Sequence, residues 1–276
     1  MKRFKKIYIE ISNICNLKCS FCPGTKREPK QMNITEFKTV IKKVAPFTDY
    51  VYFHLLGEPL LHPSLSEFLK IAEENGLKVI ITTNGTLLTK QSEVLLNSNS
   101  HYKTVISLHS FEANQSQNFN DYIDNCLGYA KMAEGKKIVV LRLWNNGGED
   151  TLNQEILQKI ENYYPTPWRD TRGGKQIGEN IYIQFGDKFD WPDITNTTES
   201  DTAFCYGMRD QIGILADGTV VPCCLDSNSQ IKLGNIFESD LESIINGQKA
   251  QNIYNGFSKR CAVEELCKKC SFARKF

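Results

Sequence analysis

The 276-residue sequence lacks a long apolar run and an excess of charge of either sign. Its start, MKRFKKIYIEIS, holds one short apolar segment broken by Glu10, and no later stretch reaches the roughly 20 apolar residues of a membrane-spanning helix. The 33 basic and 32 acidic side chains nearly cancel, which excludes the electrostatic footprint of a nucleic-acid-binding protein. We therefore expect a soluble, cytoplasmic protein without a secretion signal, which binds neither nucleic acid nor membrane.

Cysteine, in contrast, is abundant. Ten cysteines without an export signal indicate metal or redox chemistry rather than disulfide bonds, which a reducing cytosol disfavours. Three of them lie between residues 15 and 22 and six lie between residues 205 and 270. The remaining one, Cys126, is predicted to be a small buried hydrophobic residue of a helix.

Short β-rich runs alternate with amphipathic stretches, a pattern typical of a parallel sheet built from βαβ units. Helices are expected between the strands, with Thr35 and Ser64 as N-caps and Gly76 as a C-cap. Six units over about 190 residues predict an α/β fold containing a partial (β/α)6 TIM-like barrel, because a complete eight-unit barrel needs about 250 residues. The predicted strands cover residues 6–12, 50–56, 78–84, 103–109, 137–144 and 180–185.

A polar segment containing Pro192 predicts a linker after the barrel. We place the barrel at residues 1–189, the linker at 190–204 and a small α+β domain at 205–276. In that domain a hairpin turning at Asp217-Gly218 and one or two helices are expected. Residues 165–180 of the barrel contain Arg, Gly and Trp and are expected to form a loop that can contact substrate.

Polar side chains gather near the carboxyl ends of the predicted strands. Side chains alternate across a strand, so these residues can share one face. Strands buried on both faces are normally apolar throughout, and a ligand cavity explains the polar positions. Alternatively, some are loop residues whose polar groups bond to the backbone. The residues are Glu10, Ser12, His54, Thr82, Asn84, Ser107, His109, Arg142, Trp144 and Gln184.

The first cysteine set, Cys15, Cys19 and Cys22, follows the first strand directly. Zinc prefers four protein ligands, and no further cysteine or histidine lies nearby in sequence, although a distant one could complete the set. Thiolates also hold iron–sulfur clusters, in which three cysteines leave one of four irons open. An open metal position is where a substrate or cofactor binds.

The spacing of this set resembles the cluster motif of the radical S-adenosylmethionine (SAM) superfamily, whose open iron chelates the amino and carboxylate groups of SAM. The resemblance implies a 4Fe–4S cluster at the three cysteines. It also implies cofactor contacts from Phe21 beside the adenine, from Gly57 and Glu58 in a Gly-Gly-Glu motif whose first glycine is Leu56 here, and from Asn84, Ser107 and Arg142. Arg142 is a candidate either for the cofactor's carboxylate or for an acidic substrate.

The second cysteine set resembles a SPASM or twitch-type extension, which binds an auxiliary 4Fe–4S cluster. The matching positions are Cys205, Cys223, Cys267 and Cys270. Cys224 and Cys261 are surplus, and either could replace one of the four ligands. A zinc ribbon is the alternative, since four cysteines also complete a tetrahedron.

These resemblances imply reductive cleavage of SAM to a 5′-deoxyadenosyl radical, which abstracts hydrogen from a peptide or a small polar metabolite. The auxiliary cluster would take the second electron, giving net oxidation or bond formation. A monomer served by a low-potential electron donor, such as flavodoxin or ferredoxin, is expected. His54, His109 and Trp144 are candidate substrate contacts.

Two other functions stay open. As a hydrogen-atom donor, Cys224 would make the protein a radical epimerase. A non-enzymatic iron–sulfur redox sensor or a zinc-stabilised binding module is the other alternative.

Overall fold

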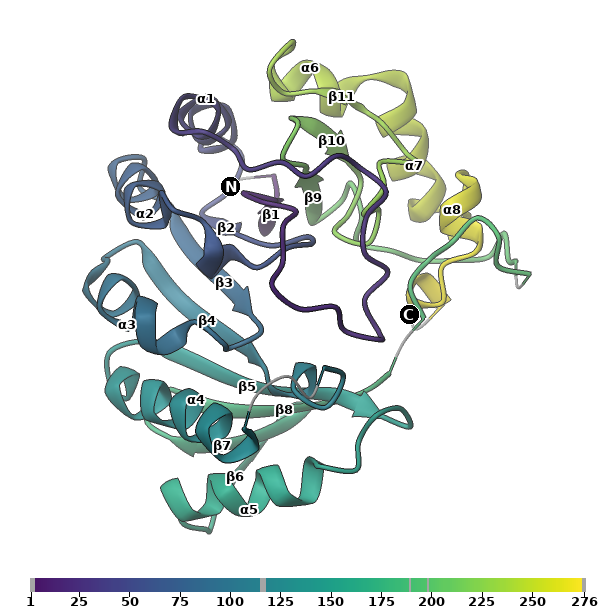
Figure 1. Cartoon of the computed structure of the whole chain (residues 1–276). Coiled ribbons are helices and arrows are strands. Elements are labelled where there is room, and N and C mark those ends of the chain that lie inside the picture. Colours follow the sequence, from purple (N-terminus) through teal and green to yellow (C-terminus); the bar gives the residue numbers. More distant parts are fainter. Residues whose placement is uncertain (1–2, 115–117, 189, 198, 275–276) are drawn as a thin grey trace.

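The computed structural model describes residues 3–114, 118–188, 190–197 and 199–274. Six strands pair in parallel to form the wall of a partial barrel (Figure 1). All six were predicted from the sequence, and the partial-barrel fold is confirmed. They are β1 (Lys6–Ile9), β2 (Tyr50–Tyr52), β3 (Lys78–Thr83), β4 (His101–Ser107), β5 (Ile138–Asn146) and β8 (Ile181–Asp187).

Helices between these strands cover the outer face of the sheet (Figure 1). They are α1 (Ile34–Val44), α2 (Leu65–Glu74), α3 (Leu88–Asn97), α4 (Phe119–Ala133) and α5 (Asn153–Tyr163), with the 3₁₀ turns η1 (Pro59–Leu61) and η2 (Leu108–Ser110) at strand exits.

The helix ends follow the sequence only in part. Gly76 ends α2 at a φ of +68°, as expected. Ser64 precedes α2, but its side chain makes no capping hydrogen bond. Thr35 is not the N-cap of α1: Asn33 accepts from the backbone N–H of Glu36, whose carboxylate accepts from the N–H of Asn33. This reciprocal capping box satisfies two free N–H groups at once, so the helix starts earlier.

The two faces of the barrel sheet differ in polarity. The face toward the helices is buried and mostly apolar, and it packs against buried helix side chains that include Cys126 of α4, as predicted. The inner face has an apolar floor of Ile80, Val105 and Val140. Toward the strand exits it becomes polar and half-buried, at Tyr52, His54, Thr82, Ser107, Arg142 and Gln184.

A hairpin extends the sheet beyond β8, where we had expected a loop. Strands β6 (Arg169–Thr171) and β7 (Gly174–Gly178) pair antiparallel, and β7 pairs antiparallel with β8. A β-carbon at Gly174 would overlap the carbonyl oxygen of Ile183, so glycine permits the close pairing. The segment is polar and lacks apolar alternation, which is why the prediction was wrong.

The C-terminal region continues the same sheet. Strands β9 (Gln211–Ile214) and β10 (Thr219–Val221) form the hairpin predicted at Asp217-Gly218, followed by β11 (Gly234–Asn235). Strand β9 also pairs in parallel with β1, which joins this region to the barrel through main-chain hydrogen bonds. Helices α6 (Leu241–Asn246), α7 (Gln248–Ser258) and α8 (Glu265–Lys268) pack beside it (Figure 1). None of the helices in the described ranges is long and apolar enough to cross a membrane.

Truncation after Trp191 should destabilise the barrel. It removes β9 and with it the fully buried side chains of Ile212 and Ile214. The edge of β1 and the apolar surface that these side chains covered become exposed. At about 2–5 kcal/mol for each such side chain, the loss approaches the total stability of a typical domain. Soluble yield and thermal unfolding measure the effect. The double variant Cys267→Ser, Cys270→Ser keeps β9 and should stay soluble; equal stability of the truncated chain would contradict the role of the β1–β9 pairing.

Candidate active site

The first cysteine set lies on the segment between β1 and α1, which runs between the barrel and the C-terminal region in Figure 1. Cys15 and Cys22 are exposed and Cys19 is half-buried. Burial raises the pKa of the Cys19 thiol to about 11, and Cys22 and Cys15 add to that rise. The three thiols are therefore near enough to interact electrostatically.

Two asparagine amides reach the sulfurs of this loop. Asn114 donates to Cys19 Sγ at 2.9 Å and to the carbonyl of Ser110 at 2.8 Å. Asn84 donates to Asn16 Oδ1 at 3.0 Å, with Cys15 Sγ at 3.8 Å. Asn84 was predicted as a site residue, whereas Asn114 belongs to no motif and reaches the loop only through the fold.

Gly57 allows the β2–η1 turn to press against the cysteine loop. Its φ is +76°, and a β-carbon there would overlap the carbonyl oxygen of Ser12 and lie 3.0 Å from that of Ile14. The backbone N–H of Glu58 donates to the same Ile14 carbonyl at 2.9 Å. Only glycine combines this dihedral angle with this approach.

The buried carboxylate of Glu58 ties three elements together. It accepts from Thr83 Oγ1 at 2.8 Å, from the N–H of Asn84 at 2.8 Å and from the N–H of Leu60 at 3.0 Å. Burial raises the pKa of Glu58 to about 7, against the effect of these hydrogen bonds. Glu58 thereby fixes the exit of β3, and with it the side chain of Asn84.

Aromatic residues from separate elements meet at the mouth of the barrel. The rings of Phe21 and His109 lie 4.9 Å apart, and together with Trp144 they line a small hollow that Glu149 and Lys188 border. Burial lowers the pKa of His109 to about 4. Phe21, His109 and Trp144, three of the predicted site residues, therefore come together.

Arg142 and His54 lie deeper in the barrel. The guanidinium of Arg142 covers the ring of Trp144 at 3.9 Å. Burial lowers the pKa of Arg142 to about 10, and it lowers that of His54 to about 3, with Arg142 as the next cause. The His54 ring packs edge-on against Tyr8 at 5.2 Å, and His54 Nε2 lies 3.4 Å from Thr82 Oγ1. Ser107 pairs with Arg142 in the sheet.

The second cysteine set contains the four predicted ligands and two surplus cysteines. Burial raises the pKa values of Cys205, Cys223 and Cys267, and nearby thiols add to each rise. Those thiols are Cys270 and Cys224 at Cys205, Cys205, Cys224 and Cys267 at Cys223, and Cys205 and Cys270 at Cys267. Cys224 also contacts the barrel, where it packs against an apolar cluster that includes Tyr8. Burial raises the pKa of Cys224, and a hydrogen bond to the Tyr8 side chain opposes part of that rise.

Cys261 is exposed, and its thiol faces the carbonyl of Ala262 at 3.8 Å. Its backbone forms an isolated bridge with Thr202. Cys224, in contrast, acts electrostatically on Cys205 and Cys223, so the choice of Cys223 over Cys224 as a ligand stays a prediction.

Two family models match the chain. The radical SAM superfamily model covers residues 9–125, and the SPASM iron–sulfur cluster-binding domain model covers residues 205–271. The chain thus carries a radical SAM domain followed by a SPASM domain. These two domains identify SAM and 4Fe–4S clusters as the cofactors of this radical SAM protein.

Similar proteins span nearly the whole radical SAM protein. It is 25% identical over 282 residues to the S-adenosyl-L-methionine-dependent 2-deoxy-scyllo-inosamine dehydrogenase of Niallia circulans, an alignment covering 98% of this chain and 94% of that protein. It is 24% identical to the antilisterial bacteriocin subtilosin biosynthesis protein AlbA of Bacillus subtilis, over 96% of this chain and 64% of that protein.

Solved structures share the fold of the radical SAM protein. BtrN in complex with AdoMet and 2-DOIA has a TM-score of 0.63 at 20% identity, covering 98% of this chain and 94% of that one. Streptococcus suis SuiB has a TM-score of 0.65 at 19% identity, covering 97% of this chain and 72% of that one.

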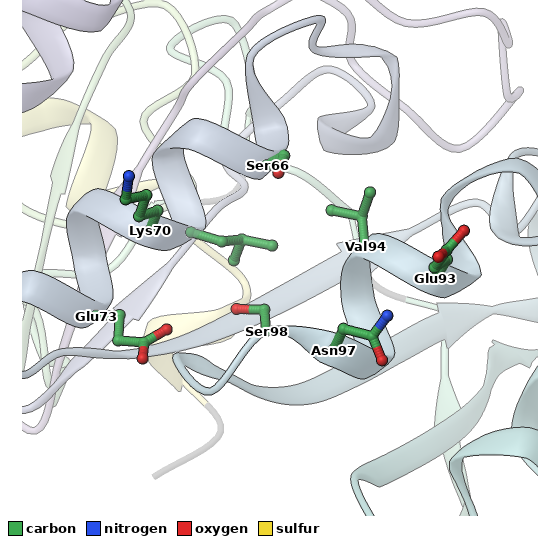
Figure 2. A pocket seen from close by; sticks show the side chains of 8 residues that line it. Ser66, Lys70, Glu73, Glu93, Val94, Asn97 and Ser98 are labelled. Carbon is green, nitrogen blue, oxygen red and sulfur yellow. The ribbon is translucent and has the colours of Figure 1, made fainter.

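A groove of about 350 Å³ lies outside this site, between α2 and α3 (Figure 2). Its rim carries charges of both signs, Lys70, Glu73 and Glu93. No predicted site residue of the radical SAM protein lines it, so we place the chemistry at the barrel mouth.

The raised pKa of Glu58 predicts a pH-dependent stability. The folded radical SAM protein keeps the proton up to about pH 7, whereas the unfolded chain loses it near 4.5, so Glu58 lowers stability as pH rises through that window. The loss is on the order of 3 kcal/mol. The unfolding free energies of the wild type and Glu58→Gln are measured from pH 5.5 to 8. That of the wild type should fall relative to that of the variant as pH rises. Glu74→Gln, on the exposed side of α2, should follow the wild type. A difference between the wild type and Glu58→Gln that does not vary with pH would contradict the assignment.

Proposed function

We propose that this radical SAM protein is an oxidoreductase that removes hydrogen from a small polar metabolite and passes the second electron to an auxiliary cluster. The match that carries the proposal is the dehydrogenase of Niallia circulans, whose alignment covers 94% of that protein. The peptide-related proteins AlbA and SuiB are covered to 64% and 72%, which makes a peptide substrate the weaker candidate.

Cys15, Cys19 and Cys22 are the proposed ligands of the SAM-binding cluster. When bound, this cluster and SAM supply a 5′-deoxyadenosyl radical. The donor set fits: three thiols share one loop, and N–H groups point at two of the sulfurs, from Asn114 to Cys19 at 2.9 Å and from Leu17 to Cys15 at 3.4 Å. Such hydrogen bonds stabilise thiolate ligands and tune an iron–sulfur cluster's potential.

The residues around this loop would bind SAM and exclude water. Phe21 offers its ring for the adenine and is backed by His109. Gly57, Glu58 and Asn84 hold the turn beside the cysteine loop, and Ser107 lies at the exit of β4. Shielding by these packed side chains protects a radical that would otherwise react with solvent or protein.

Cys205, Cys223, Cys267 and Cys270 are the proposed ligands of the auxiliary cluster. Among the described residues, no three His, Cys, Asp or Glu side chains converge as the ligands of a single ion do. Electrostatic effects nevertheless link these thiols, and Cys224 acts on Cys205 and Cys223 as well. Four thiolates occupy all four irons, so the chemistry of this set suits electron transfer. A low-potential protein such as flavodoxin or ferredoxin would supply the electrons.

A radical epimerase is the second candidate, because Cys224 packs against the apolar cluster that includes Tyr8 and its thiol is hydrogen-bonded to the Tyr8 side chain. In this reaction the substrate carbon radical takes the hydrogen atom of the Cys224 thiol. The resulting thiyl then needs one electron, from the low-potential donor, and one proton from water.

Iron content tests the two ligand sets. The anaerobically purified protein should be brown and hold about eight irons per chain, and with dithionite and SAM it should release 5′-deoxyadenosine. Cys19→Ala or Cys223→Ala should each lose about half of the iron. Cys261→Ala is the matched control and should keep all of it. A colourless, zinc-loaded protein would instead support the binding-module alternative.

Cys224→Ala separates oxidation from epimerisation. An oxidase should retain all its iron and keep turning over, because the Cys224 thiol takes no part. An epimerase should still cleave SAM but lose inversion, and its wild-type product formed in D2O should carry one deuterium from the exchangeable thiol. Mass spectrometry of the product and iron analysis give both readouts. Loss of oxidised product in Cys224→Ala with the iron retained would contradict the oxidase.

A further inference from the structure

Three polar residues form a row across adjacent strands of the inner wall. Arg142 of β5 pairs in register with Ser107 of β4 on one side and with Gln184 of β8 on the other. Register partners present their side chains to the same face of a sheet. All three are half-buried, so water reaches this part of the barrel interior.

The interior also holds hydrogen-bonding atoms that have no partner. In the described part of the chain, three buried side-chain N or O atoms make no hydrogen bond: His54 Nδ1, Arg142 Nε and Tyr164 Oη. The first two belong to the same interior, where Arg142 acts electrostatically on His54. Buried polar atoms are almost always paired in native proteins, so an unpaired guanidinium N–H indicates a missing acceptor.

The charge around Arg142 favours an anionic acceptor. The buried carboxylate of Glu10, which directly follows β1, is paired with Arg27 at 2.6 Å and accepts from the N–H of Ala216 at 3.0 Å. Lys103 and Lys6 are the neighbouring cations, and Arg142 and Lys6 both lower the pKa of Lys103 after the effect of burial. The wall near Arg142 therefore has uncompensated positive charge.

Most neighbours of Arg142 differ from those of Cys15. The groups that act on Arg142 are Tyr8 of β1, Cys224 of the C-terminal region and Tyr52 of β2. The side chains bonded to the Cys15 region are instead Asn84 and Thr86, at the exit of β3. Arg142 meets the cysteine loop through Trp144 and His109, which line one hollow with Phe21.

We propose that Arg142, with Ser107, Gln184 and His54 beside it, binds an oxyanion of the substrate, either a carboxylate or a phosphate. The ring of Trp144 covers one face of the guanidinium and holds its plane, which leaves the N–H edge for a charge-assisted, two-pronged contact. This inference rests on the proposed function, because it places the substrate inside the barrel. The substrate assigned here is an anion, whereas the name of the Niallia circulans relative contains an amine, which carries the opposite charge.

Anion binding to the SAM-loaded holoenzyme tests the proposal. Inorganic phosphate and succinate are titrated separately under anaerobic conditions, with tryptophan fluorescence as the readout because Trp144 covers Arg142. We expect saturable binding of at least one anion, and the tighter one identifies phosphate or carboxylate chemistry. Arg142→Gln should weaken binding at least tenfold, and Arg142→Lys, which keeps the charge but loses the planar fork, should weaken it less.

Arg169→Gln is the matched control, since Arg169 lies on the exposed hairpin and bonds to Gln176. It should bind the anions like the wild type. The proposal is overturned if neither anion binds, if Arg142→Gln binds as tightly as the wild type, or if that variant loses affinity for SAM instead, which would assign Arg142 to the cofactor's carboxylate. Arg142→Lys keeps the test valid should Arg142→Gln unfold.

The same wild-type samples test the proposed function separately. Dithionite-driven release of 5′-deoxyadenosine without substrate depends on the SAM-binding cluster and not on anion binding. Its absence would refute the proposed function, whereas intact release without anion binding would refute only the assignment of Arg142.

Discussion

The backbone of β1 is hydrogen-bonded along both edges, to β2 on one side and to β9 on the other. This four-residue strand therefore belongs to the barrel and to the C-terminal region at once. The loop with Cys15, Cys19 and Cys22 begins just after it, and the β9–β10 hairpin beside it leads into Cys223 and Cys224. The position of β1 consequently sets both cysteine sets relative to the barrel interior.

Much of this arrangement is local in sequence and could be predicted. The parallel strands appear in the sequence as runs rich in β-branched residues, and the cysteine spacings can be read directly from the sequence. The parity of side chains along each strand also predicts the polar inner face that holds His54, Ser107 and Arg142. These features depend on neighbouring residues only, or on the fixed two-residue period of a strand.

What sequence reasoning missed depends on contacts between distant segments. The pairing of β1 with β9 joins residues about 200 positions apart, and no local pattern records it. Asn114 bonds to Cys19 across 95 positions, and an isolated asparagine in a loop carries no signal of its own. The choice between Cys223 and Cys224 depends on how the chain turns after β10, which adjacent identical residues leave open.

The ion pair of Arg27 with Glu10 belongs to a bridge between the two cysteine-bearing regions. Arg27 also donates to the Ser227 carbonyl, and Thr25 on the same segment donates to Asn228, both in the C-terminal region. Ordering of the segment that carries the first cysteine set therefore restrains the backbone just after Cys224. The two cysteine sets are mechanically linked by these contacts as well as by the sheet.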